Sequence, residues 1–260
     1  MKWRSLEETA QEAETRSLVE VYAERKELIA KYVPPDIQAI HARAVEELKQ
    51  SGIAERSLQV GTAAPPFELS DHNGKPVRSS ELLDRGPLVI CFFRGRWCPF
   101  CVGQMEAMNA IVPQLQELGA SLVGISPQTV HQSYLMADQH KLRFPLLSDA
   151  GNQVARQFGL VYRVPGYQQE VYSRAFVNLP FVNSDASWEL PIPATYIVGT
   201  DPNTDNHRDH RVTQRQNPQR EHSQPGATAP HKILFASANP DYTERPEPGE
   251  ILQVLAQLLS

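Results

Sequence analysis

Cys98 and Cys101 lie three positions apart in the stretch FFRGRWCPFC at 92–101, and their type and spacing could do chemistry. Such a pair can contribute to a zinc site, form a disulfide or work as a redox dithiol. A structural zinc needs four ligands, and a zinc ribbon carries two such pairs where this chain has one. Two inert core cysteines are the plainer alternative, because buried free cysteine is common. The pair favours a redox dithiol, whereas Cys91, the third cysteine, is expected in the core.

The position of Cys98 matters more than the bare spacing. It follows an apolar run at 88–93, predicted to be a buried strand, and stands at the start of a predicted helix. Unpaired N–H groups and the dipole of a helix N-terminus both favour thiolate over thiol. A cysteine with a pKa near 8.5 is only about 3% thiolate at pH 7, whereas a pKa of about 7 makes it half ionised. Arg94 and Arg96 add positive charge, and Pro99 fits the first helical turn.

The surrounding elements alternate between strands and helices, which predicts an α/β fold with a central mixed sheet flanked by helices. A hairpin is expected around Asn73-Gly74. One helix is expected over 102–118 and another over about 129–140. Further strands are predicted at 88–93, 121–126, 194–198 and 232–236, and a final helix at 250–259.

Residues 1–57 are predicted to be an N-terminal extension of two helices, followed by one domain over 58–260. The first helix would begin at a capping box, Ser5-Leu6-Glu7-Glu8, and end at Pro34-Pro35. Asp36 is expected to cap the second helix. We expect the extension to pack on the main domain or on a second subunit, and not to form an active site.

Residues 201–230 contain few apolar side chains and are expected to be a flexible insertion. The insertion and its C-terminal flank carry His207, His210, His222 and His231. A polar segment of this kind binds metal adventitiously more often than specifically, so no metal site is predicted.

Composition excludes several classes of protein. The net charge of −5 gives no sign of a nucleic-acid or membrane partner, and the longest apolar run is far too short for a membrane span. The charged N-terminus lacks the apolar core of a secretory signal. Three cysteines cannot form a disulfide framework. We therefore expect a cytoplasmic protein without a cofactor or metal.

Three stretches resemble the peroxiredoxin-like branch of the thioredoxin superfamily, close to the alkyl hydroperoxide reductase and thiol-specific antioxidant family. VGTAAPPFELSDHNGKPV is similar to the opening hairpin of peroxiredoxins, and LVGISPQT to their second strand and following turn. FPLLSDAGNQVARQFGL at 144–160 is the longest and most specific match. The resemblance covers 58–200 and resumes at about 231–258, and it implies a thioredoxin-like fold.

The family's active-site pattern carries over only in part. Aligned without gaps, it places the peroxidatic cysteine on Cys101, the threonine position on Cys98 and the proline position on Arg94. Pro193 stands where peroxiredoxins keep an arginine. Thioredoxin-like proteins have a cysteine at the position of Cys98 and a cis-proline at that of Pro193. A cis Pro193 would lay an open strand edge beside the dithiol, whereas an ordinary trans proline opening an edge strand is the alternative.

The resemblance implies a thiol-dependent oxidoreductase that reduces hydroperoxides through a Cys98–Cys101 dithiol-disulfide cycle, regenerated by a thioredoxin-type or small-thiol reductant. The first alternative is a thioredoxin-like reductase of protein disulfides, with Cys98, the more exposed cysteine, as nucleophile. The second is a redox-inactive binding scaffold. Arg94, Arg96, Trp97, Pro99 and Pro193 are the predicted supporting residues. A homodimer is compatible with the resemblance, because peroxiredoxins often pair through sheet edges.

Overall fold

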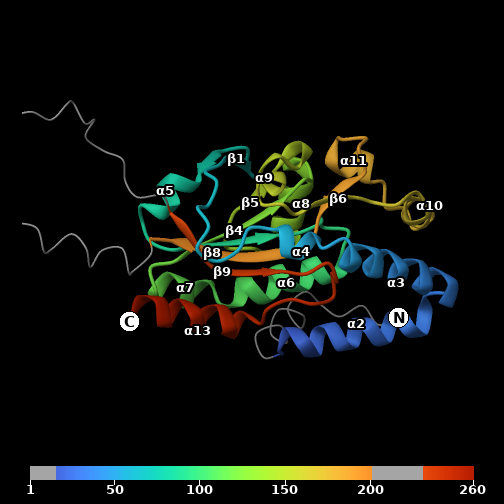
Figure 1. Ribbon diagram of the computed structural model, residues 1–260, viewed down its shortest axis with the longest axis horizontal. Coiled ribbons are helices and arrows are strands. Elements are labelled where there is room, and N and C mark those ends of the chain that lie inside the picture. Colours follow the sequence, from blue (N-terminus) through green and yellow to red (C-terminus); the bar gives the residue numbers. More distant parts are fainter. Residues whose placement is uncertain (1–15, 201–230) are drawn as a thin grey trace, which may run out of the picture.

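A seven-stranded mixed sheet forms the centre of the computed structural model (Figure 1), which describes residues 16–200 and 231–260. The strands lie in the order β2-β1-β5-β4-β3-β8-β9, and only the β3–β4 and β4–β5 pairs are parallel. The strands are β1 (Glu68–Asp71), β2 (Pro76–Arg78), β3 (Leu88–Phe92), β4 (Ser121–Ser126), β5 (Leu146–Ser148), β8 (Ala194–Gly199) and β9 (Lys232–Ala238). A separate ribbon pairs β6 (Val161–Arg163) with β7 (Glu189–Pro191). The predicted mixed α/β class is confirmed.

Helices cover both faces of the sheet, so the central strand β3 is buried along its whole length. One core contains side chains of α6 (Pro99–Ala110), α7 (Val112–Glu117), α8 (Val130–Gln139) and α13 (Pro248–Leu259). The opposite core contains α4 (Ile53–Arg56), α5 (Ser79–Leu83) and α9 (Gln153–Gln157), which follows the short 3-10 helix η1 (Ala150–Asn152). Two more helices, α10 (Gly166–Arg174) and α11 (Leu179–Asn183), lie between β6 and β7 in the chain.

The N-terminal extension packs along the dithiol side of the domain (Figure 1). Helix α2 (Leu18–Tyr32) lies against α6, and α3 (Pro35–Gln50) lies against α10. Ser17 caps α2 in a capping box with Glu20, whereas the predicted box at Ser5–Glu8 lies outside the described residues. The domain boundary at 57/58 stays a prediction.

Asp36 is not the cap of the second helix, contrary to our expectation. Pro34 occupies that position and Pro35 opens the helix, so Asp36 already lies in the first turn. Proline suits this place because its fixed φ is helical and the first turn needs no N–H donor.

The predicted helix over 102–118 is instead two helices, with the break at Ile111. Pro113 causes it, because proline has no N–H to donate to the carbonyl of Asn109 one turn earlier. That carbonyl instead accepts a hydrogen bond of 2.6 Å from the Arg143 guanidinium.

The hairpin at Asn73-Gly74 and the later strands are confirmed. The predicted insertion over 201–230 and three of the four histidines, His207, His210 and His222, lie outside the described residues.

Candidate functional site

The dithiol lies at the junction between β3 and α6. Cys98 is the residue preceding α6, and Pro99 opens the helix as predicted. The turn before it closes through a hydrogen bond of 3.1 Å from the Cys98 amide to the Gly95 carbonyl. Gly95 has φ 145°, and a β-carbon there would lie 2.6 Å from the Trp97 ring nitrogen. Glycine at this position therefore lets the Trp97 ring fold back over the loop.

Both sulfurs of the pair are covered by protein. Cys98 and Cys101 are each 0% exposed, and both are free thiols. The expectation that Cys98 would be the more exposed of the two is wrong, because aromatic rings pack over the helix start. Tyr22 and Tyr242 both contact the Phe100 ring edge-on, at centroid distances of 5.0 and 5.7 Å.

Arg94 donates a hydrogen bond of 3.0 Å from Nη2 to the sulfur of Cys98. Burial on its own raises the pKa of Cys98. The hydrogen bond from Cys101 and the charge of Arg94 outweigh burial, so the pKa of Cys98 lies well below its ordinary value. Burial and the adjacent Cys98 thiolate raise the pKa of Cys101 well above its ordinary value. The two shifts have opposite directions, so Cys98 is the sulfur of the pair that ionises more readily.

The surroundings of Arg94 explain why this charge acts on the sulfur. The side chain is only 4% exposed, and its other terminal nitrogen donates to the Tyr172 hydroxyl at 3.2 Å. Its guanidinium lies over the rings of Tyr242 and Trp97, at 3.9 and 5.0 Å from their centroids. The groups that raise its pKa are cysteines and tyrosines, and no carboxylate is among them. A buried cation needs a counter-ion, and the sulfur of Cys98 is positioned to supply it when it ionises.

Arg96, the other predicted arginine, points elsewhere. Its Nε donates to Gln132 on α8 at 2.7 Å, and its backbone amide donates to the Gln128 side chain at 2.9 Å. The side chain of Arg96 therefore links the dithiol loop to α8 by a hydrogen bond.

Trp97 is half-buried, and its ring packs on the ring of Tyr172 at a centroid distance of 5.2 Å.

Pro193 joins β7 to β8 and does not take the predicted cis form. Every peptide bond is trans in residues 16–200 and 231–260. The strand it opens is not an edge either, since Ala194 pairs with Phe92 on one side and with Ala238 on the other. The Pro193 carbonyl accepts from the Asn239 amide at 3.1 Å. No open strand edge therefore starts at Pro193.

The extension is bonded to the first turn of α6. Tyr22 of α2 donates to the Phe100 carbonyl at 2.5 Å, and Arg25 donates to the carbonyl of Pro99. Helix α2 can approach this closely because Gly103 has no side chain, and a β-carbon there would overlap the Arg25 guanidinium. Sequence reasoning missed Tyr22 and Arg25, because they lie about 75 residues before the motif with the spacing of an ordinary amphipathic helix.

A pocket of about 680 Å³ opens between the extension and the dithiol loop. Arg94, Trp97, Pro99 and Phe100 of the loop form one wall. Helices α2 and α3, the segment 171–177 and residues 241–243 form the others. Cys98 is not part of the lining, but its two neighbours in the chain are, and its sulfur accepts the hydrogen bond from Arg94.

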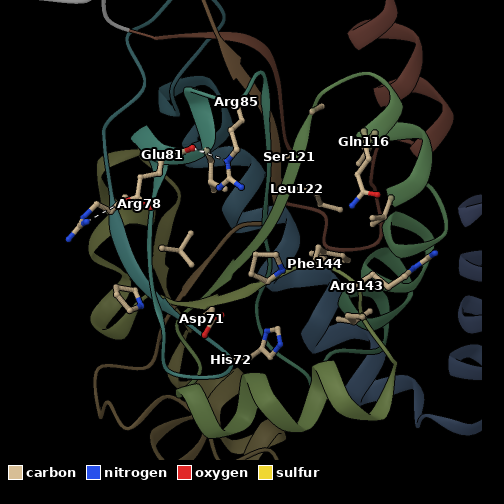
Figure 2. A pocket seen from close by; sticks show the side chains of 18 residues that line it. Asp71, His72, Arg78, Glu81, Arg85, Gln116, Ser121, Leu122, Arg143 and Phe144 are labelled. Atoms are coloured by element: carbon tan, nitrogen blue, oxygen red, sulfur yellow. Dashed lines mark hydrogen bonds and ion pairs between the residues drawn. The ribbon is translucent and has the colours of Figure 1, made fainter.

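A second cavity of about 590 Å³ lies beside β1, β2 and the start of β4, and Figure 2 shows its lining. Its arginines are exposed and are held by partners of their own. Arg78 binds Glu68 and Glu81 at 2.8 and 3.0 Å, and Arg143 donates to a backbone carbonyl. No cysteine lines this cavity.

In the part of the chain that the structure describes, no group of three or more histidine, cysteine or acidic side chains could hold a metal ion. Among the helices of the same residues, none has the length and apolarity needed to cross a bilayer.

The model of the AhpC/TSA family matches residues 60–204, more than half of the chain. The chain belongs to this family. A putative peroxiredoxin of Mycobacterium tuberculosis is 34% identical over 120 residues, which are 46% of this chain and 78% of that protein. Chloroplastic peroxiredoxin Q of Arabidopsis thaliana is 32% identical over 148 residues, covering 55% of this chain and 68% of the relative. The chain is therefore a thiol-dependent peroxidase of the peroxiredoxin type.

The fold agrees with this assignment. The crystal structure of peroxidoxin BcpB from Mycobacterium tuberculosis superposes with a TM-score of 0.53 at 23% identity. The superposition covers 78% of this chain and 99% of that one. The predicted thioredoxin-like fold is thus confirmed, as is the family resemblance. Helices α2 and α3 lie outside the residues that the family model matches.

Proposed function

We propose that Cys98 is the cysteine that attacks the hydroperoxide and that Cys101 resolves it. The observation that carries this assignment is the 3.0 Å hydrogen bond from Arg94 to Cys98, made by a buried guanidinium that has no carboxylate among the groups acting on it. The gapless family pattern favours the opposite order, with Cys101 attacking. A neutral Cys101 with a raised pKa is a poor nucleophile but a suitable proton source.

The reaction runs in two steps. The Cys98 thiolate attacks one oxygen of ROOH, the O–O bond breaks, and the alkoxide leaves with a proton from Cys101 as ROH. Cys98 is then a sulfenic acid, and the Cys101 thiolate attacks its sulfur. The S–O bond breaks, and the departing hydroxide takes one proton from solvent and leaves as water. One hydroperoxide thus becomes ROH and H₂O, while one thiolate and one thiol become a disulfide.

Arg94 has a second task during the first step. Negative charge moves from sulfur to the departing oxygen, and a fixed cation beside both stabilises that change without reorganising water. This places Arg94 in the role that the family's missing threonine and arginine would otherwise fill.

Turnover also needs an opening step, because neither sulfur is reached by solvent. Trp97 is the candidate cover: it is half-buried, and its ring nitrogen has no hydrogen-bond partner in the described structure. A displaced Trp97 ring would uncover Cys98 from the pocket side.

Reduction of protein disulfides by Cys98 is the second candidate function. The low pKa of Cys98 suits that chemistry as well. A protein disulfide is bulky, however, and the strand that would receive its chain beside Pro193 is already paired on both sides. The geometry therefore favours the smaller hydroperoxide.

The disulfide must be reduced by two external thiols, and we propose a thioredoxin-type protein or a small thiol as donor. We also retain a homodimer and a cytoplasmic location as proposals. The cycle requires a reducing compartment. Because peroxiredoxins Q among the relatives are chloroplastic, the chloroplast stroma is an alternative location that would also meet this requirement.

Sulfenic acid trapping tests the order of attack. Cys98→Ser and Cys101→Ser proteins, both in a Cys91→Ala background, are treated with hydroperoxide and dimedone and analysed by mass spectrometry. We expect the adduct on Cys98 in the Cys101→Ser protein and none in the Cys98→Ser protein. An adduct on Cys101 alone would reverse the roles, and adducts in neither would remove the peroxidase cycle from this pair.

A further inference from the structure

We propose that α2 and α3 complete a specificity pocket for the apolar body of an organic hydroperoxide. The inference rests on the proposed function of Cys98 and adds the substrate class of that site. Its key observation is the pocket of about 680 Å³, with the dithiol loop as one wall and the extension as another.

Two of the walls that face the loop, those of α2 and α3, lie outside the matched family region, whereas the segment 171–177 lies inside it. Ile29 of α2, Ile37 and Val45 of α3, and Tyr242 near the C-terminus line the pocket, whereas the family model ends at residue 204 and begins at residue 60. The part of the pocket that α2 and α3 build is thus an addition to the matched region.

The pocket suits an uncharged body. Its two lysines are already paired at the rim, Lys26 with Glu244 at 3.5 Å and Lys49 with Asp241 at 3.7 Å. His41 on its wall has a lowered pKa because burial and the charge of Arg94 disfavour its protonated form. The remaining walls are mostly aliphatic and aromatic, and the other cation among the described lining residues, the Arg94 guanidinium, is already bound to Cys98.

One polar group is positioned for the peroxide end. Arg94 lines the pocket, is 4% exposed, and its Nε has no hydrogen-bond partner within the described residues. The same guanidinium holds Cys98. A hydroperoxide whose apolar body fills the pocket would therefore bring its –OOH group to Arg94 and to the loop that covers the sulfur. A volume of this size far exceeds hydrogen peroxide and falls within the range of about 300–1,000 Å³ for small-molecule sites.

Substrate selectivity tests the pocket. We would measure kcat/KM for hydrogen peroxide and for cumene hydroperoxide, in the wild type and in Ala42→Phe, which places a ring in the pocket. Ala39→Phe is the matched control, because Ala39 is an exposed alanine of the same helix that does not line the pocket. We expect the ratio of cumene hydroperoxide to hydrogen peroxide to fall at least about tenfold in Ala42→Phe. Ala39→Phe should keep the wild-type ratio. Equal ratios in all three proteins would overturn the inference.

Binding without turnover separates this inference from the proposed function. The alcohol product, 2-phenylpropan-2-ol, is titrated into reduced Cys98→Ser protein by calorimetry, with and without Ala42→Phe. Saturable binding that Ala42→Phe abolishes supports the pocket even if Cys98 proves not to be peroxidatic. No binding, together with normal hydroperoxide turnover, overturns the pocket and leaves the peroxidase standing. Slower reduction by thioredoxin in Ala42→Phe, with an unchanged hydroperoxide ratio, also overturns it and assigns the groove to the reductant.

Discussion

The cavity beside the dithiol and the cavity of Figure 2 are similar in volume, about 680 and 590 Å³. They differ in the groups that surround their arginines. Arg78 in the second cavity is exposed and sits between two carboxylates, which raise its pKa. Arg94 in the first is buried and has aromatic rings and one sulfur around it.

The difference is between an arginine whose charge is already neutralised by carboxylates and one whose charge can stabilise a reacting group. An exposed arginine between two carboxylates is a surface ion pair, which contributes little and leaves no anion to stabilise. A buried arginine without a carboxylate must stabilise whatever anion forms next to it, and here that is a thiolate. The comparison predicts that substitutions at the first site change chemistry and those at the second do not.

Cys98→Ser should cause the largest effect. A serine hydroxyl stays protonated beside Arg94, so hydroperoxide turnover should fall at least about a thousandfold. Steady-state peroxidase assays measure this, with Cys91→Ala as the control: burial raises the pKa of Cys91 to about 12, and its removal should leave turnover intact. Substantial peroxidase activity in Cys98→Ser would show that the sulfur beside Arg94 is not the reacting group, and the contrast between the two cavities would then have no chemical consequence.

Arg94→Gln should lower kcat/KM for hydroperoxide by about a hundredfold at pH 7, because it removes the charge that favours the thiolate. The pH profile should change as well. With a lowered Cys98 pKa the wild-type rate should be flat around neutral pH, since the thiolate is already formed. In Arg94→Gln the rate should rise about tenfold per pH unit up to the ordinary pKa near 8.5. Parallel profiles in the two proteins would contradict the assignment.

The sequence predicted the local structure of the dithiol loop better than it predicted which distant residues pack around that loop. The C-x-x-C spacing, the strand before it and Pro99 at the helix start are local properties, and residues close in sequence determine them. The burial of the sulfurs depends on Tyr22, Tyr172 and Tyr242, which come from distant segments. Their spacing is that of ordinary core residues, so only the folded chain shows that Tyr172 and Tyr242 contact Arg94 and that Tyr22 contacts Phe100.

Pro193 is a residue whose place in the chain was predicted correctly but whose conformation and surroundings were not. The family pattern placed it correctly before a strand, but the isomer of a proline bond and the pairing of the strand depend on the whole sheet. Strand β8 is paired on both sides, with Phe92 and Ala238 opposite Ala194, and no local motif encodes these partners.

Tyr22→Phe should cause a smaller effect than either change at the loop. It removes the hydrogen bond to the Phe100 carbonyl while keeping the ring packing, so the free energy of unfolding should fall by about 1 kcal/mol. Urea denaturation measures this, with Tyr32→Phe as control, because Tyr32 lies exposed on the same helix. An equal loss in both variants would show that the bond between α2 and α6 contributes nothing of its own.

Arg85→Gln, in the cavity of Figure 2, should have the smallest effect. Arg85 is an exposed side chain of that lining, which contains no cysteine, and its Nε donates to the Glu81 carbonyl at 3.1 Å. Peroxidase assays should give kcat/KM within about twofold of the wild type. A loss comparable to that of Arg94→Gln would erase the distinction between the two cavities.

Ultraviolet titration of the thiolate tests the central claim most directly. Absorbance at 240 nm is followed from alkaline to acidic pH in the reduced wild-type and Arg94→Gln proteins, each against its Cys98→Ser counterpart, and the difference isolates Cys98. We predict that the Cys98 thiolate is fully formed at pH 7 and disappears only in the acidic range, and that Arg94→Gln moves this transition upward toward the ordinary value near 8.5. A wild-type transition at or above 8.5, or one that Arg94→Gln leaves in place, would contradict the account.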